Sequence, residues 1–221
     1  MELLQSLAII ALPLILAVTL HEAAHGWIAD KLGDPTARSL GRITLNPIPH
    51  IDPLGTIVLP LGLFAVSTLV SGHGMLFGWA KPVPVMAGRL RSPRRDMALV
   101  AMAGPGANLL MALAWGVAAG LVKSSGLTLG MAANFLLEMA IYGVFINVIL
   151  LVINLLPILP LDGGRVLASV LPRGLAGPYA RLEPWGLVVL LALLLSGALG
   201  PFIMPMIFGL WSGILRTFGL A

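Results

Sequence analysis

The residues best able to do chemistry form a His-Glu-x-x-His pattern, His21-Glu22-Ala23-Ala24-His25, inside the first apolar stretch of the chain. On a helix this spacing places both histidines one turn apart on one face, where their imidazole nitrogens can bind a single zinc ion. The glutamate between them lies where a general base for a zinc-bound water belongs. Three ionisable groups in one apolar turn are costly to bury unless they line a cavity or bind a metal. The pattern therefore predicts a zinc-dependent hydrolytic site at membrane depth.

The overall composition indicates a membrane protein. Hydrophobic residues make up 58% of the 221 residues, charged residues make up 10%, and the mean hydropathy is +1.00. A soluble domain carries about 25% charged residues, and this length has room for about four to six membrane spans. We therefore expect a multi-pass protein of the cell (inner or plasma) membrane with one domain over 1–221, comprising a core at 4–170 and a C-terminal helical hairpin at 184–220. The basic residues are scattered through short loops, which indicates topology signals and no nucleic-acid partner.

Apolar stretches and turn residues predict an all-α polytopic fold with about five transmembrane helices, a re-entrant apolar segment and short membrane-associated β-strands. The expected helices cover residues 4–31, 97–122 and 131–156, followed by a helical hairpin within 185–220 that is broken at 197–201. The expected strands cover 39–45 and 79–85, and the prolines in the second suit an edge strand.

The apolar segment 53–78 allows two topologies. It is long enough to span the membrane, but its many glycines and prolines suit a dip into the membrane and back. With a dip, the basic loops 36–50 and 86–95 both lie on the cytoplasmic side. That side then holds every Lys and Arg except Lys123, including the downstream arginines Arg165, Arg173, Arg181 and Arg216. The excess of positive charge in cytoplasmic loops favours the re-entrant topology and places the active site toward the cytoplasmic side.

A third zinc ligand must come from elsewhere, because catalytic zinc usually takes three protein ligands and a water. Asp162 is the strongest candidate, since an acid at membrane depth requires a cation and two prolines break the helix just before it. Two alternatives for Asp162 are an N-cap of the following helix and an ion pair with Arg165. His50 and His73 lie in loops or at bends, where we expect a structural or gating role instead of ligation.

Three asparagines can support such a site. Asn147 and Asn154 are seven residues apart and share one face of the helix expected at 131–156. Asn154 is the candidate donor to a tetrahedral oxyanion, because it lies close in sequence to Asp162. For Asn147, helix–helix hydrogen bonding is the favoured interpretation. Asn108 opens the preceding helix among small residues, which indicate close helix packing, and it is a candidate support of the site.

Three motifs together resemble those of the site-2 protease family of intramembrane zinc metalloproteases. The motifs, in chain order, are the HEAAH of residues 21–25, then Gly104-Pro105-x-x-Asn108, and then Asn154-x-x-Pro157 followed by Leu161-Asp162-Gly163. The resemblance spans about residues 15–170. Asn46-Pro47 and the segment 78–85 further resemble the compact prokaryotic branch that lacks a PDZ or CBS domain.

This resemblance implies a mechanism and a substrate class. It implies one zinc ion per chain on His21, His25 and Asp162, with Glu22 as the general base and Asn154 near the oxyanion. It also implies that the partners are single-span membrane proteins in the lipid bilayer, cut by regulated intramembrane proteolysis. The segment 53–78 has no counterpart in the minimal three-helix core of that family.

Two other function classes share some of these features. A divalent-metal secondary transporter also places broken helices and acids near the membrane midplane, and a non-catalytic membrane scaffold could keep the fold. However, the chain shows no internal repeat, and Glu22 within the HExxH pattern has no obvious purpose in transport. A scaffold would have no need of Glu22 either. We therefore expect an enzyme.

Overall fold

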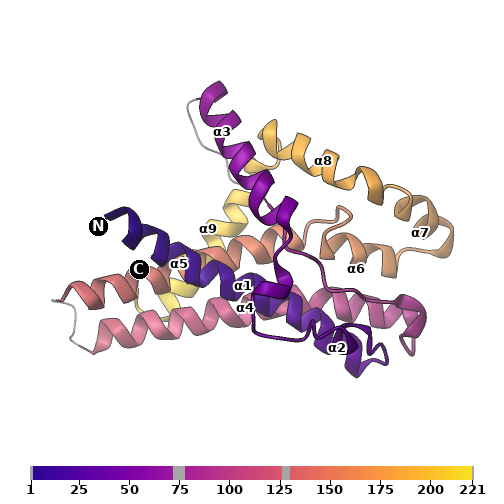
Figure 1. Cartoon of the computed structure of the whole chain (residues 1–221), viewed down its shortest axis with the longest axis horizontal. Coiled ribbons are helices and arrows are strands. Elements are labelled where there is room, and N and C mark those ends of the chain that lie inside the picture. Colours follow the sequence, from indigo (N-terminus) through magenta and orange to yellow (C-terminus); the bar gives the residue numbers. More distant parts are fainter. Residues whose placement is uncertain (1, 72–77, 126–129, 221) are drawn as a thin grey trace.

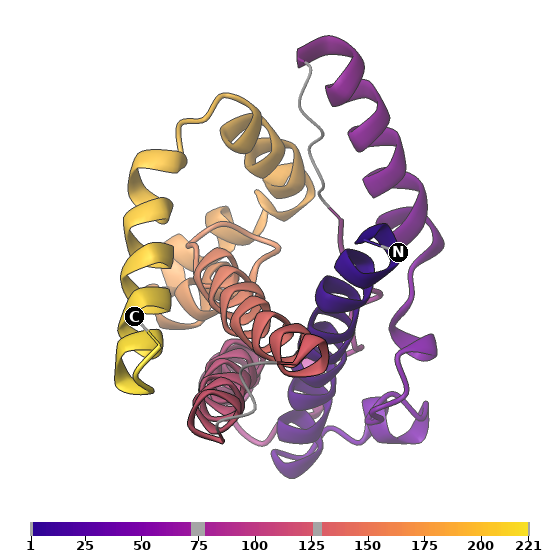
Figure 2. The same cartoon turned by 90° about the vertical axis from the view of Figure 1, so that its left-hand side faces the viewer.

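Three long helices lie side by side and form the centre of the molecule (Figures 1 and 2). A computed structural model describes residues 2–71, 78–125 and 130–220 of the chain. The three helices are α1 (Glu2–Lys31), α4 (Pro93–Ser124) and α5 (Met131–Asn154). In Figure 1, α1 and α5 run in the same direction, and α4 runs in the opposite direction. The predicted helices at 4–31, 97–122 and 131–156 are thereby confirmed, with ends shifted by a few residues.

The helices α1, α4 and α5 are long and apolar enough to cross a membrane, as expected for a multi-pass membrane protein. A fourth span is present if α7 (Arg173–Ala180) and α8 (Glu183–Leu195), which meet at 69°, count as one broken span. The residues that the structure describes therefore contain three or four candidate spans, fewer than the five or so predicted. The 185–220 region does contain two helices, α8 and α9 (Gly200–Thr217), but α8 has only 13 residues, well short of the roughly 20 that a span requires.

The helix α9 packs along α5 and extends the apolar core. Buried side chains from α4, α5 and α9 form this core, namely Ala112, Val144, Val148, Val152, Ile203, Ile207, Ile214 and Leu215. Many large apolar side chains face outward instead, for example Leu110 and Phe202. An outer surface of this kind suits contact with lipid.

The end of α9 corrects one part of the predicted charge distribution. The Lys123 ammonium donates to the Gly219 carbonyl at 2.5 Å, so α9 ends beside the end of α4. Arg216 therefore lies at the same end of the molecule as Lys123 and not with the other arginines. The reason is that α8 is too short to carry the chain across before α9 begins.

The segment 53–78 leaves and rejoins the helical core at the same place. It begins with a π-helical turn, η2 (Pro53–Val58), and continues as α3 (Leu59–Ser71), which projects away from the three long helices in Figure 2. The Trp79 N–H donates to the Gly55 carbonyl at 3.0 Å, and the Lys81 N–H donates to the His50 carbonyl at 2.9 Å, within the 3-10 helix η1 (Ile48–His50). The two ends of the segment are therefore neighbours.

The two predicted β-strands are wrong. Residues 39–45 contain the end of the short helix α2 (Thr36–Ser39) and a turn, because Gly41 adopts a left-handed conformation with φ of 66°. Residues 79–85 are extended, as their prolines favour, but no strand pairs with them in the described part of the chain. Their backbone groups bond instead to side chains and loop carbonyls, such as the side chain of Arg42 and the His50 carbonyl.

Asp34 joins the two loops at the end of α1. One carboxylate oxygen accepts a 2.6 Å hydrogen bond from the Met86 N–H, and the other accepts from the N–H and hydroxyl of Thr36. Burial alone would raise the pKa of Asp34, but these hydrogen bonds outweigh it and hold the pKa below its ordinary value. The Arg91 N–H also donates to the Leu32 carbonyl at 3.1 Å. The loop after α1 and the loop before α4, which contains the 3-10 helix η3 (Ala87–Arg89), are therefore one structural unit.

Candidate active site

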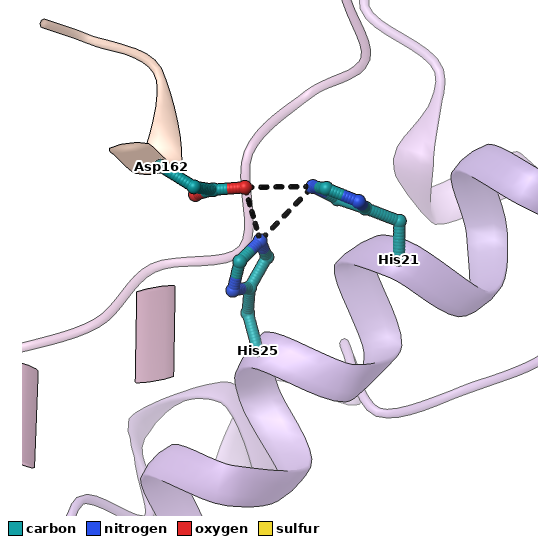
Figure 3. A group of neighbouring side chains, drawn as sticks. All are labelled: His21, His25 and Asp162. Carbon is teal, nitrogen blue, oxygen red and sulfur yellow. Dashed lines mark hydrogen bonds and ion pairs between the residues drawn. The ribbon is translucent and has the colours of Figure 1, made fainter. Parts of the chain in front are cut away.

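Two histidines and an aspartate converge inside the helical core (Figure 3). His21 and His25 lie one turn apart on α1, and their Nε2 atoms are 3.1 Å apart. Asp162 is the first residue of α6 (Asp162–Val170), and its Oδ2 lies 3.1 Å from Nε2 of His21 and 3.3 Å from Nε2 of His25. All three residues are buried. The structure thus brings together the three residues predicted as zinc ligands.

The hydrogen bonds of the two imidazoles indicate that this cluster fits a cation. Nδ1 of His21 lies 2.6 Å from Oδ1 of Asn108, and Nδ1 of His25 lies 2.7 Å from the Val100 carbonyl. Both acceptors require a proton on Nδ1, which in the neutral imidazole leaves a lone pair on Nε2. Two lone pairs and the Oδ2 atom of Asp162, which accepts no hydrogen bond within the described part of the chain, then face one another. Such an arrangement is repulsive unless a positive charge lies between the three atoms.

The separations are also compatible with zinc. Tetrahedral zinc with nitrogen and oxygen ligands at about 2.0 Å places those ligand atoms about 3.3 Å apart. The three separations here, 3.1 to 3.3 Å, are close to that value. Two imidazoles and one carboxylate are also a common ligand set of catalytic zinc, which keeps a fourth position for water.

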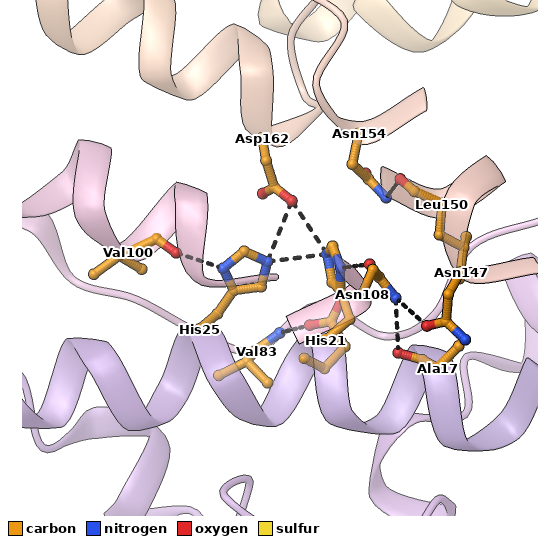
Figure 4. A network of polar contacts seen from close by, with 11 residues as sticks. Ala17, His21, His25, Val83, Val100, Asn108, Asn147, Leu150, Asn154 and Asp162 are labelled. Carbon is orange, nitrogen blue, oxygen red and sulfur yellow. Dashed lines mark hydrogen bonds and ion pairs between the residues drawn. The ribbon is translucent and has the colours of Figure 1, made fainter. Parts of the chain in front are cut away.

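An asparagine network holds His21 in place (Figure 4). Asn108 on α4 accepts from His21 through its oxygen, and its amide nitrogen donates to Oδ1 of Asn147 on α5 at 3.1 Å. The Asn147 amide in turn donates to the Gly143 carbonyl at 2.9 Å. Both asparagines are fully buried. Asn108 therefore contacts the predicted ligand directly, and Asn147 acts on the site through Asn108.

Gly104 allows α4 to approach the two histidines. A Cβ atom at this position would lie 2.4 Å from Nε2 of His25 and 2.5 Å from Nε2 of His21. Real Cβ contacts are essentially never so short, so any larger residue would have to displace the imidazoles. The neighbouring Gly106 has nothing within 4 Å of such an atom. The Gly-Pro-x-x-Asn motif thus provides both space and a hydrogen-bond acceptor.

A sharp return of the chain carries Asp162 to α1. α5 ends at Asn154, and the loop that follows packs against the first residues of α6. A Cβ at Gly163 would lie 2.2 Å from the Leu155 carbonyl oxygen, and one at Gly164 would lie 2.5 Å from the Leu159 nitrogen. Only glycine fits at either position. The Asp-Gly-Gly sequence therefore allows α6 to begin close enough to α1 for its first carboxylate to reach the histidines.

The alternatives for Asp162 do not describe the arrangement found. Leu161 is the N-cap residue of α6, and no side chain caps that end. Arg165 lies 3.8 Å from Glu183, and among the described residues it forms no ion pair with Asp162. His50 is buried, with Nε2 3.3 Å from the Thr44 carbonyl, and it is not part of the His-His-Asp cluster. His73 lies outside the described residues.

Glu22 faces a cavity next to the cluster. This cavity has a volume of about 580 Å³, and it is lined by Glu22, the three clustered residues, Asn154 and most residues of the extended segment 78–85. Oε2 of Glu22 accepts a 2.8 Å hydrogen bond from the Val83 N–H. The cavity is large enough for a short piece of extended peptide beside the three clustered side chains.

Asn154 is the last residue of α5 and lines the same cavity. Its side-chain nitrogen donates to the Leu150 carbonyl in its own helix at 3.0 Å, as Figure 4 shows. A carboxamide has two N–H groups, so the second remains for a group in the cavity. Its position suits the predicted donor role, which stays a prediction.

Comparison with known proteins places the chain in a family. It is 36% identical to the protein YwhC of Bacillus subtilis, which is assigned as a zinc metalloprotease, over 95% of this chain and 90% of that protein. The chain belongs to peptidase family M50. The M50 profile itself matches residues 122–197, which include Asn154 and Asp162. This family contains the site-2 proteases that the motifs resemble.

More distant M50 relatives agree with this assignment. Two proteins named Rip2, also assigned as zinc metalloproteases, are 29% identical in Mycolicibacterium smegmatis and 27% identical in Mycobacterium tuberculosis. These matches cover 88% and 89% of this chain, and 69% and 70% of the two relatives. No solved structure matches the chain. As an M50 zinc metalloprotease the chain is an enzyme, which argues against the transporter and scaffold alternatives.

Some parts of this M50 site leave little signal in the sequence. The Val100 carbonyl that orients His25 is a backbone group, and any residue could supply it. The hydrogen bond from Val83 to Glu22 is also made by the backbone. Its only trace is the pair of prolines on either side of Val83, which leave its N–H as the sole backbone donor of three consecutive residues.

Proposed function

We propose that this M50 metalloprotease hydrolyses peptide bonds within or next to the transmembrane segment of single-span membrane proteins. The observation that carries the proposal is the position of the His-His-Asp cluster. His21 and His25 lie on a helix able to span the membrane, and the cavity beside them is bounded by three such helices, α1, α4 and α5. A cluster at that depth meets peptide bonds that are themselves in the membrane.

The chemistry follows from the residues around the cavity. His21, His25 and Asp162 would hold one zinc ion per chain, which when bound polarises the substrate carbonyl and makes water a better nucleophile at neutral pH. Glu22 takes a proton from the attacking water and returns it to the leaving amine. The free N–H of Asn154 donates to the oxygen that becomes negative during the attack.

The substrate must be extended where it is cut, because a helix hides its carbonyls in internal hydrogen bonds. The segment 79–85 can hold such an extended peptide. Its N–H groups at Trp79, Lys81 and Val83 bond to the protein, so these alternate residues occupy one edge. Ala80, on the opposite edge, has no backbone hydrogen bond within the described chain and lines the cavity. A substrate strand can pair with that edge.

A second cavity supports a membrane-embedded substrate. It has a volume of about 390 Å³, and its lining is mostly apolar. It shares wall residues such as Val18, Trp79, Ala80 and Leu150 with the catalytic cavity, and it continues along α1 to Ile15 and Leu14. Apolar side chains of an unwound spanning segment suit such a space.

Positive charge supports an active site toward the cytoplasmic side. The end of α1 that follows His25 carries Lys31 and then the loop with Arg38 and Arg42, and the connected loop before α4 carries Arg89 and Arg91. Such loops are typical of the cytoplasmic face of bacterial and other cell membranes. In this orientation the segment 53–78, whose ends are neighbours, enters and leaves the membrane from the cytoplasmic side.

The substrate class can be tested with the second cavity. Purified enzyme in liposomes should cleave a single-span peptide, and Ile15→Phe should slow cleavage of substrates with large apolar side chains more than those with alanine. Leu12→Phe is the matched control, because Leu12 has the same exposure on α1 but does not line the cavity. Equal effects of both substitutions on all substrates would show that the second cavity does not hold substrate side chains. Failure to cleave any spanning peptide would contradict the proposed function itself.

A further inference from the structure

Arg42 is a buried arginine with an unusual set of partners. Its side chain is almost fully buried, and none of the ion pairs in the described part of the chain involves it. Its Nη2 donates to the Lys81 carbonyl at 2.7 Å and to the Pro82 carbonyl at 3.3 Å, and its Nε has no partner among the described residues. Burying a charge without a carboxylate is unfavourable. The free-energy cost of burying Arg42 indicates that its contacts with these two carbonyls serve the function of the protein.

The carbonyls that Arg42 holds come directly before the N–H that contacts Glu22. Val83 follows Pro82, and its N–H donates to Oε2 of Glu22 at 2.8 Å. Pro82 and Pro84 have no N–H, so Val83 is the only backbone donor that this part of the segment can offer to the carboxylate. Prolines also restrict the backbone, so the position of the Lys81 and Pro82 carbonyls largely fixes the direction of the Val83 N–H.

Two glycines make this arrangement possible. Gly41, with φ of 66°, turns the chain after α2, and Arg42 follows directly with its N–H bonded to the Ala37 carbonyl. Gly26, next to His25, leaves room for the side chain of Val83, because a Cβ at Gly26 would lie 3.1 Å from Cγ1 of Val83. The extended segment therefore packs directly against the helix that carries Glu22.

We propose that Arg42 is a positioning residue for the general base. By holding the carbonyls of Lys81 and Pro82, it keeps the Val83 N–H against one oxygen of Glu22 and leaves the other oxygen directed at the attacking water. This inference rests on the proposed role of Glu22. Arg42 acts through the backbone and touches neither the substrate nor the three predicted zinc ligands.

The proposal is tested by separating kcat from KM and from zinc binding. Arg42→Gln should lower kcat by about 10²-fold, the scale expected when a catalytic group is misplaced by about 1 Å, with KM and zinc content unchanged. The kcat of Arg42→Lys should lie between those of Arg42→Gln and the wild type, because one ammonium cannot bond both carbonyls as well as a guanidinium. Arg38→Gln is the control for the lost charge, since Arg38 is exposed and pairs with Asp30 at 2.5 Å.

The Val83 N–H provides a second, independent set of variants. Val83→Pro removes the donor and should lower kcat as Arg42→Gln does, whereas Val83→Ala keeps the donor and should lose less of kcat than Val83→Pro. The double variant Arg42→Gln with Val83→Pro should be no slower than the slower single variant, because both changes break one chain of contacts. Hydrogen exchange of the Val83 amide, measured by mass spectrometry without substrate, should be faster in Arg42→Gln than in wild type.

The outcomes separate this inference from the proposed function. If Glu22→Gln cleaves at the wild-type rate, Glu22 is not the base and the proposed function fails together with this inference. If Glu22→Gln is inactive but Arg42→Gln has normal kcat, or a raised KM alone, Arg42 does not position the base. Additive losses in the double variant would also overturn the inference.

Discussion

Oδ1 of Asn108 lies 2.6 Å from Nδ1 of His21, although the two residues are on different helices and 87 positions apart. This contact fixes the proton of His21 on the nitrogen that faces away from the cluster. Through the amide of Asn108 it also connects α1 to Asn147 on α5. All three long helices therefore contribute to the orientation of one imidazole.

Removing Asn108 should weaken zinc binding without destroying it. Asn108→Ala leaves Nδ1 of His21 without its acceptor, and loss of such a partner typically lowers metal affinity by about 10- to 100-fold. The measurement is zinc affinity by competition with a chelator. Asn134→Ala, on an exposed face of α5, is the control and should bind zinc normally. Unchanged affinity in Asn108→Ala would show that the asparagine serves helix packing only.

Gly104→Ala should abolish zinc binding, and Gly106→Ala should not. The added Cβ at Gly104 would lie within 2.5 Å of ring atoms of both histidines, whereas the one at Gly106 meets nothing within 4 Å. Both substitutions replace a glycine on the same helix, so they have similar effects on helix propensity. Zinc content of the two purified variants is the measurement. If Gly104→Ala retains full zinc, the close approach of α4 to the site is wrong.

Asn154→Ala should lower the rate and preserve the metal. Its amide lines the catalytic cavity but is not among the clustered residues. Losing one donor to a developing oxyanion typically lowers kcat by about 10²- to 10³-fold. Single-turnover cleavage and zinc content are measured together, and Asn147→Ala is expected to be closer to neutral in rate. A folded, zinc-loaded Asn154→Ala enzyme with a normal rate would contradict the oxyanion role.

The three residues of the cluster could be predicted from the sequence because each lies in a short, recognisable local pattern. The HExxH spacing follows from helix geometry, and two prolines before Asp162 marked a break at which the chain could return. In the structure, Nε2 of His21, Nε2 of His25 and Oδ2 of Asp162 lie within 3.3 Å of one another. For Asn147 the hydrogen bond to Asn108 on a neighbouring helix agrees with the favoured interpretation.

The sequence predicted the backbone around the site less well. The residues at 39–45 resembled a strand, but the left-handed turn at Gly41 ends that conformation. The segment 79–85 is extended, yet its hydrogen-bond partners come from residues 23 or more positions away, such as Thr56 or the side chain of Arg42. Such pairing depends on tertiary contacts, which periodicity does not encode. In the same way, apolar composition at 185–220 did not show that α8 is short.

The topology can be tested by labelling. Leu32 and Arg91 are joined by a backbone hydrogen bond, so the loops on either side of the segment 53–78 should be on the same side of the membrane. Cysteines introduced at Ser39 and Ser92 should react alike with an impermeant thiol reagent, both from the cytoplasmic side. Because the natural chain has no cysteine, the background is low. Opposite accessibility would establish the segment as a full span.

The central claim is that Glu22 is the base of a zinc protease that acts on membrane-spanning peptides. It is tested most directly by measuring zinc content and cleavage of a single-span peptide in liposomes for the same Glu22→Gln preparation. Because Glu22 is not among the clustered residues, we expect about one zinc per chain and no detectable cleavage. Cleavage at the wild-type rate by zinc-loaded Glu22→Gln protein would contradict the account.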